Sequence, residues 1–182
     1  MNLQNLSFLF LITCILSCKK IDYNGYRVYK IKEGRHRSNT AYCTTKSNYI
    51  SFEAMFDESA QYTSNDPTNQ YDVNKLYGLS DCGNNHTKNS IRFGWRWLND
   101  SLEILWYKRE DGDFSFEKIT TIDINTSYYY TITFTEDSYI LNVDGIEVVV
   151  DRKCSETYRR YYLYPYFGGD EEAPHDITIR IK

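Results

Sequence analysis

The sequence predicts an all-β protein in which antiparallel sheets pack face to face. The 182 residues include 18 Tyr, 9 Phe and 3 Trp together with many Ile, Val and Thr, and these residue types favour strands. Good helix formers do not recur at helical spacing. Short alternating segments instead follow one another with turn residues between them, which is typical of a sandwich.

The expected strands come in quick succession. In residues 49–56 alternation places Ile50, Phe52, Ala54 and Phe56 on one face, which we expect to be buried. Further strands are expected at 90–98, 102–109, 114–122, 128–135, 138–144, 146–150, 160–167 and 176–182. The turn pairs between them include Asn99-Asp100, Asp111-Gly112 and Asp144-Gly145. Residues 57–74 are rich in Asp, Ser, Asn and Thr, so we expect a long polar loop there.

The N-terminus predicts an exported lipoprotein. The apolar run Leu6 to Leu16 is too short for a membrane span, which needs roughly 20 residues, but has the length of a signal-peptide core. Residues 15–18 resemble a lipobox, in which Cys18 is acylated after removal of residues 1–17. An ordinary secretory signal is the alternative. We expect residues 18–40 to be a tether that leads into a first strand, and residues 41–182 to form the sandwich domain.

This leader predicts a location in the bacterial cell envelope. The protein would be held in the outer membrane by its lipid anchor alone and would face the periplasm or the cell surface. The formal net charge of -4 argues against nucleic acid as a partner. Cys43, Cys82 and Cys154 remain after processing, so at most one disulfide forms among them, and the pairing is open.

Two segments of the second half carry a family resemblance. The run Tyr128 to Thr135, followed by a strand that ends in Val143-Asp144-Gly145, resembles the late hairpin of the concanavalin A-like lectin/glucanase superfamily, which includes laminin-G-like modules. Residues 75–82 with 90–97, and residues 162–170 with 173–177, are similar to uncharacterised bacterial secreted lipoproteins of the same fold. The resemblance implies a curved, two-sheet jelly-roll sandwich whose concave face holds glycan, in some members with structural calcium at the rim.

The strand at 91–98 is the first candidate binding surface. Alternation places Trp95 and Trp97 on one face and Arg92 and Arg96 on the other. If the aromatic face is core, the two guanidiniums lie about 14 Å apart at roughly 3.4 Å per residue, which suits an anionic polysaccharide. If the aromatic face is exposed, the indoles offer a stacking platform for sugar rings. Alternatively, each arginine is paired with a carboxylate on a neighbouring strand.

The second candidate is the aromatic segment before the C-terminus. Tyr162, Tyr164 and Tyr166 share one face in an uninterrupted strand and would combine ring surface with hydroxyl hydrogen bonds, although stacked core tyrosines are the alternative. Pro165 indicates an edge or bulge position. His175 follows in the next loop and joins the candidate ligand-binding residues.

Acidic residues near this segment suggest one cofactor. Asp170 and Asp176 would supply the oxygen ligands that a structural calcium ion prefers, with a solvated turn as the alternative. We expect no other cofactor.

Catalysis has less support than binding. The Glu-x-Asp-x-x-Glu strand of glucanases with this fold is absent, and so are the Gln-x-His and Tyr-x-Lys strands of the alginate-lyase-like members. We therefore expect a carbohydrate-binding protein for an anionic polysaccharide. A polysaccharide lyase or glycoside hydrolase of the same fold, and a structural or adhesin lipoprotein with a protein partner, are the alternatives.

Overall fold

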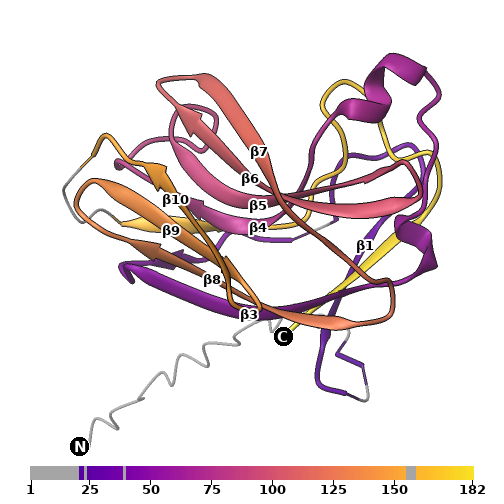
Figure 1. Ribbon diagram of the computed structural model, residues 1–182, viewed down its shortest axis with the longest axis horizontal. Coiled ribbons are helices and arrows are strands. Elements are labelled where there is room, and N and C mark those ends of the chain that lie inside the picture. Colours follow the sequence, from indigo (N-terminus) through magenta and orange to yellow (C-terminus); the bar gives the residue numbers. More distant parts are fainter. Residues whose placement is uncertain (1–20, 23, 39, 155–158) are drawn as a thin grey trace, which may run out of the picture.

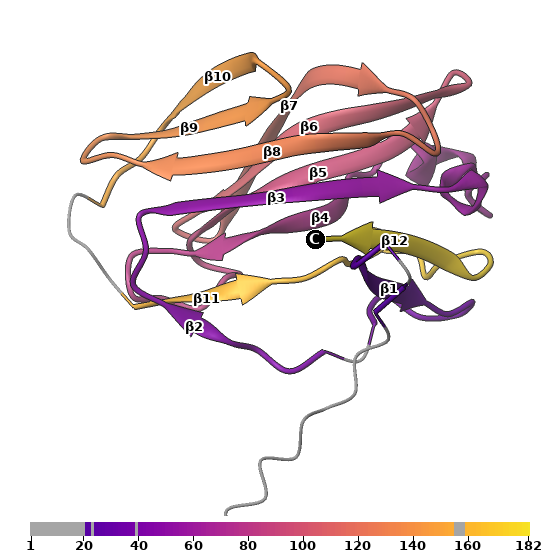
Figure 2. The same ribbon diagram turned by 90° about the horizontal axis from the view of Figure 1, so that it is seen from below.

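Two six-stranded antiparallel sheets face each other in the computed structural model, which describes residues 21–22, 24–38, 40–154 and 159–182 (Figures 1 and 2). The first sheet contains β1 (Arg27–Ile31), β12 (Ile177–Ile181), β3 (Tyr49–Phe56), β8 (Ser127–Phe134), β9 (Ser138–Val143) and β10 (Ile146–Asp151), in that order. The second contains β2 (Thr44–Thr45), β11 (Arg160–Leu163), β4 (Asn74–Ser80), β5 (Ser90–Leu98), β6 (Ser101–Glu110) and β7 (Asp113–Ile122). The predicted all-β, two-sheet sandwich is confirmed.

The turn chemistry follows the sequence closely. Asn99, Asp100, Asp111 and Asp144 adopt positive φ, a conformation that short polar side chains tolerate better than β-branched ones. The expected polar loop at 57–74 contains two short 3-10 helices, η1 (Glu58–Ala60) and η2 (Pro67–Tyr71). Asp57 and Asp66 cap them by accepting backbone N–H groups. Within the described residues, none of the helices has the length and apolar character that crossing a membrane would take.

Three strands differ from the sequence expectation. β4 lies in a segment for which no strand is predicted, and it carries a register shift between Lys75 and Tyr77. The strand expected at 160–167 ends at Leu163, because Pro165 has no N–H to donate to a ladder. β1 pairs along its whole length with β12 and buries Tyr29 and Ile31, so the core already includes residues before 41. Cys18 and the leader lie outside the described residues.

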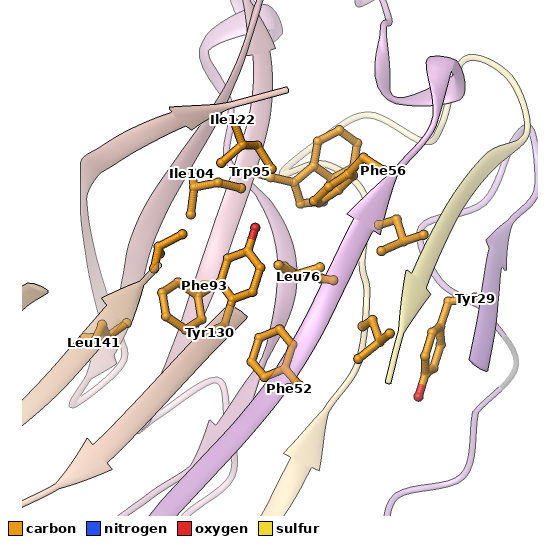
Figure 3. Close-up of a cluster of buried hydrophobic side chains, with 14 of the residues drawn as sticks. Tyr29, Phe52, Phe56, Leu76, Phe93, Trp95, Ile104, Ile122, Tyr130 and Leu141 are labelled. Carbon is orange, nitrogen blue, oxygen red and sulfur yellow. The ribbon is translucent and has the colours of Figure 1, made fainter. Parts of the chain in front are cut away.

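Aromatic rings fill the space between the sheets (Figure 3). The Phe52 and Tyr130 rings of the first sheet stack at 5.0 Å between centroids, and Phe56 contacts Trp95 of the second sheet at 5.2 Å. Trp95 is completely buried. The alternative in which the aromatic face of β5 meets solvent is therefore wrong, because that face closes the sandwich.

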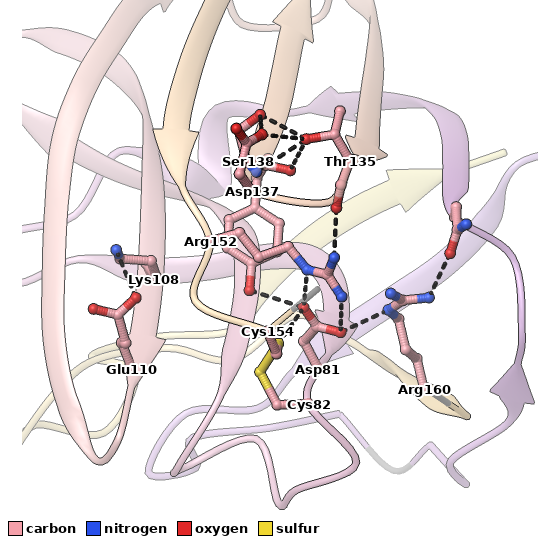
Figure 4. A network of polar contacts seen from close by, with 12 residues as sticks. Asp81, Cys82, Lys108, Glu110, Thr135, Asp137, Ser138, Arg152, Cys154 and Arg160 are labelled. Atoms are coloured by element: carbon pink, nitrogen blue, oxygen red, sulfur yellow. Dashed lines mark hydrogen bonds and ion pairs between the residues drawn. A yellow bond between two sulfur atoms is a disulfide. The ribbon is translucent and has the colours of Figure 1, made fainter. Parts of the chain in front are cut away.

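A buried carboxylate joins the two sheets at one end (Figure 4). Asp81, directly after β4, accepts hydrogen bonds from Arg152 Nε at 2.7 Å, Arg160 Nε at 2.9 Å and the Tyr139 hydroxyl at 2.9 Å. The side chains of the carboxylate and of both arginines are almost fully buried. Next to this network, Cys82 forms a disulfide with Cys154 across 72 residues, whereas Cys43 is free and exposed.

We predict that Asp81→Asn strongly destabilises the protein. Removing one partner of a buried ion pair leaves uncompensated charge, here on two guanidiniums, and costs about 3–5 kcal/mol. Urea unfolding without reductant, so that the disulfide stays intact, measures the change in the free energy of unfolding. Asp176→Asn is the matched control: its carboxylate binds two exposed lysines, so its unfolding midpoint should move little. Equal midpoints for the two variants would contradict the structural role of Asp81.

Candidate functional site

The outer face of the second sheet carries the candidate site. Because Phe93 and Trp95 point into the core, alternation turns Arg92, Gly94 and Arg96 to the outside, as the sequence predicts for one of its alternatives. Paired residues on neighbouring strands share a face. The second sheet is also strongly curved (Figure 1).

The strand register gathers a row of side chains on this outer face. Arg92 on β5 pairs with Tyr107 on β6, which pairs with Phe116 on β7. In the adjacent row Arg109 on β6 pairs with Phe114 on β7. A guanidinium, a phenol and a phenyl ring thus stand side by side across three strands.

Three pockets that share lining residues extend from this row. The first, of about 440 Å³, is lined by residues that include Lys75, Arg92, Tyr107, Arg109 and Tyr166. The second, of about 520 Å³, shares Arg92 and Tyr166 with the first and extends to Arg37. The third, of about 840 Å³, shares Arg37 and Tyr166 with the second and extends over the segment 30–36. We call the three pockets together the basic groove.

The charge of the basic groove is opposite in sign to that of the chain. Its lining contains seven lysines and arginines but three carboxylates, while the formal net charge of the protein is -4. The cations are Lys30, Lys32, Arg35, Arg37, Lys75, Arg92 and Arg109, and the acids are Asp72, Asp170 and Glu172. Lys30 and Lys32 are paired with Asp176, so the positive charge that attracts anions locally belongs mainly to the other five cations.

Arg92 lies at the junction of the first two pockets. Only 8% of the residue is exposed, and no ion pair of the described residues involves it. Its Nε is buried without a hydrogen-bond partner, and its guanidinium lies 5.6 Å from the centroid of the Tyr107 ring. Burial lowers the pKa of Arg92 to about 10, so the group stays charged at neutral pH. Across from it Gly78 leaves room, because a Cβ there would come within 2.5 Å of the Arg92 Cα.

Arg96 does not join Arg92 in the groove. Its Nε donates to Glu103 Oε2 at 2.7 Å and its Nη1 donates to the Tyr71 carbonyl at 2.9 Å. Glu103 also binds Lys118 at 3.0 Å. The expected pair of free guanidiniums is therefore wrong for Arg96, which is paired with a carboxylate on the neighbouring strand. Trp97 is partly buried and packs against the core, and it lines none of the three pockets of the groove.

Lys75 on β4 is a second buried cation, and it pairs with Gly94 on β5. Only 7% of it is exposed, its Nζ donates to the Gly168 carbonyl at 2.8 Å, and the ammonium lies 4.8 Å from the centroid of the Tyr107 ring. Burial, with the nearby charge of Arg92, lowers the pKa of Lys75 to about 7. The amine is thus close to half protonated at neutral pH.

The tyrosines expected on one face are divided between two. Tyr162 and Tyr164 pack against the core, although Tyr164 also lines the second pocket of the groove, and Tyr77 stacks on Tyr162 at 5.9 Å. Tyr166 instead lines all three pockets of the groove and forms an isolated bridge with Lys75. The break after Leu163 interrupts the alternation, which explains why Tyr166 points the other way.

His175 and the two expected calcium ligands are not brought together. The His175 Nε2 contacts the Ser59 carbonyl at 2.9 Å, outside the groove. Asp176 accepts from the Lys30 and Lys32 ammonium groups at 2.9 Å each, and these bonds hold the pKa of its carboxyl far below its usual range. Asp170 lines the groove. Neither belongs to a cluster of three ligating side chains among the described residues, where such a cluster forms only at Asp81 and the disulfide.

Most residues that line the groove, including Lys30, Lys32, Arg35 and Arg37, are not predicted from the sequence. Five others lie in the part of the groove that contains Arg92. Lys75, Tyr107, Arg109, Phe114 and Phe116 line its first pocket. A usable signal exists for the last two: two phenylalanines at alternating positions in an otherwise polar strand are hard to explain as core. The other three depend on the register between strands.

Comparison with known proteins establishes the fold. No protein-family model and no curated protein match the sequence. Among solved structures, the alginate lyase AlyC3 superposes with a TM-score of 0.65 at 11% identity, over 91% of this chain and 76% of that chain. The alginate lyase AlyA1 from Zobellia galactanivorans superposes with a TM-score of 0.58 at 13% identity, over 88% of this chain and 76% of that chain. The laminarinase catalytic domain from Thermotoga petrophila superposes with a TM-score of 0.56 at 14% identity, over 87% of this chain and 75% of that chain. The chain therefore has the concanavalin A-like jelly-roll fold, as its sequence predicts.

Proposed function

We propose that this protein binds an anionic polysaccharide along the basic groove, as an exported lipoprotein of the cell envelope. The observation that carries the proposal is Arg92, a buried guanidinium without a carboxylate partner among the described residues, at the centre of a cationic groove. Burying an unpaired charge costs several kcal/mol, so proteins pair such groups or supply them to a ligand.

The chemistry of the groove favours a sugar that bears carboxylate or sulfate groups. Guanidinium forks bind these groups through two parallel hydrogen bonds. The Tyr166 ring, which is partly exposed and lines all three pockets, adds surface that matches the C–H face of a pyranose. The cations run from Arg109 past Arg92 to Arg35, so a chain suits the groove better than a single anion. One protein of this fold, AlyC3, has been solved in complex with dimannuronate, an acidic sugar.

The sequence of residues 15–18 supports the lipid anchor. Cleavage before Cys18 and acylation of its thiol and amino terminus would attach the domain to the membrane. The intact mass of the mature protein tests this step: cleavage at another residue without added acyl chains would leave a secreted protein that has no anchor.

A second candidate function is eliminative cleavage of the same polymer, and Lys75 favours it. The neutral amine would take the proton from the carbon next to the carboxylate, and the electron pair would form a carbon–carbon double bond. The glycosidic oxygen would leave with the proton of the Tyr166 hydroxyl. Incubation with alginate, pectin or glycosaminoglycan separates the candidates, because a lyase releases unsaturated ends that absorb ultraviolet light. Retention of the polymer without such ends indicates binding alone.

We predict that Arg92→Gln weakens binding of the anionic polysaccharide at least about tenfold, because it removes a charge-assisted contact. Affinity electrophoresis or calorimetry with alginate, pectin and glycosaminoglycan measures the loss. Arg96→Gln is the matched control on the same strand and face: its arginine is already paired, so affinity should stay within about twofold. Equal losses in both variants would mean that binding depends on net charge rather than on Arg92.

We also predict that binding strengthens as the pH falls from 8 to 6. Lys75 has a pKa of about 7, so acid increases its charged fraction and thereby the attraction for an anion, by up to about tenfold in affinity. His86 lines the same pocket and also has a lowered pKa, so Lys75→Met identifies the group responsible. Calorimetry at several pH values should show a flatter profile for this variant. An unchanged profile would assign the effect to His86.

A further inference from the structure

Two phenylalanines on the edge strand β7 stand at the end of the basic groove. Phe114 is 58% exposed and Phe116 is 39% exposed, and they occupy alternate positions on the outer face of the second sheet. Both line the pocket that contains Arg92. An exposed apolar side chain on an edge strand favours aggregation, so a pair of large ones calls for a reason.

The rings of these residues are aligned with that of Tyr107. The planes of Phe114 and Phe116 differ by 3°, and each lies within 9° of the Tyr107 plane. The three centroids are 6.1 to 6.4 Å apart. The Arg109 guanidinium lies 5.1 Å from the Phe114 centroid and 5.9 Å from the Tyr107 centroid. Tyr107 itself is only 4% exposed, so the accessible rings are those of Phe114 and Phe116, with Tyr107 beside them. We call the three residues together the aromatic platform.

Exposure alone does not distinguish the platform from other edge residues. Ile146 and Val149 on β10, the edge strand of the first sheet, are 47% and 63% exposed. They line none of the three pockets of the basic groove. What sets the platform apart is ring alignment, contact with a cation and continuity with the groove.

We propose that the aromatic platform is a stacking subsite for a pyranose ring of the bound polyanion. An apolar C–H face of the sugar would lie on the rings, and its carboxylate or sulfate would reach Arg109. The Arg109 guanidinium is oriented by the Phe114 ring and by the hydrogen bond that its Nη1 donates to the Gly112 carbonyl at 2.7 Å. This inference rests on the proposed function, and it assigns residues and a ligand class to the end of the groove away from segment 30–36.

The strand spacing makes the subsite selective for ligand length. Phe116 lies two strands from Arg92, about 10 Å at roughly 4.8 Å per strand. One sugar residue is too small to contact both, whereas an oligosaccharide can contact them together. Loss of the platform should therefore affect long ligands and spare short ones.

The test is calorimetry on the full mature chain with the double variant Phe114→Ala/Phe116→Ala. Probes are oligosaccharides of alginate and polygalacturonate and the matching monosaccharides. We expect affinity for the bound oligosaccharide to fall about tenfold, and affinity for the monosaccharide to change less than about twofold. Phe114→Tyr/Phe116→Tyr should keep wild-type affinity, and Ile146→Ala/Val149→Ala on the other edge is the matched control.

Each other outcome overturns the inference. If Arg92→Gln weakens oligosaccharide binding but the alanine pair does not, the platform proposal falls and the proposed function stands. If the wild-type chain binds no anionic oligosaccharide, both fall. If sedimentation shows that the alanine pair dissociates an oligomer, the rings belong to an interface between copies of the chain. Equal losses for monosaccharide and oligosaccharide would indicate a disturbed groove rather than a missing subsite.

Discussion

The site depends on the burial of large rings by one face of β5. Phe93 and Trp95 have no exposed surface, and they close the sandwich against Phe52 and Phe56 of the facing sheet. A slip of one residue would turn these rings to water and the intervening polar side chains into the core, so the register is strongly determined. Hydrophobic packing between the sheets thereby places the Arg92 guanidinium on the opposite face.

Local pairing then separates two arginines that are equivalent by pattern. Arg96 stands across from Glu103 in the register of β5 and β6, and its charge is neutralised there. Arg92 stands across from Tyr107, and its only neighbour on β4 is a glycine. The Arg92 guanidinium lies near the Tyr107 ring and near the like charges of Arg109 and Lys75. This is an unfavourable environment for a cation in the free protein. Such stored electrostatic cost is characteristic of sites that receive an anion.

Sequence reasoning predicts the fold and a few residues of the basic groove, Arg92 and Tyr166 among them. Alternation predicts the sandwich and separates Arg92 from Trp95, because side-chain direction is a local property of a strand, but it leaves open which of the two faces is outside. The partner of each arginine depends on register between strands, which the sequence of one strand does not contain. Tyr166 is misassigned with Tyr162 because Pro165 breaks the alternation between them, even though the proline itself indicates an edge or a bulge. Lys75 is missed because its strand carries a bulge that hides the period of two.

The bond between Cys82 and Cys154 encloses the groove floor in a covalent loop. Strands β5, β6 and β7 lie inside this loop. β4, which contains Lys75, and β11, which leads to Tyr166, lie outside it. The strands on the two sides of the basic groove are thus joined by a disulfide as well as by the hydrogen bonds of the sheet. This cross-link forms under oxidising conditions, and a chain kept among reductants would lack the bond that constrains these strands.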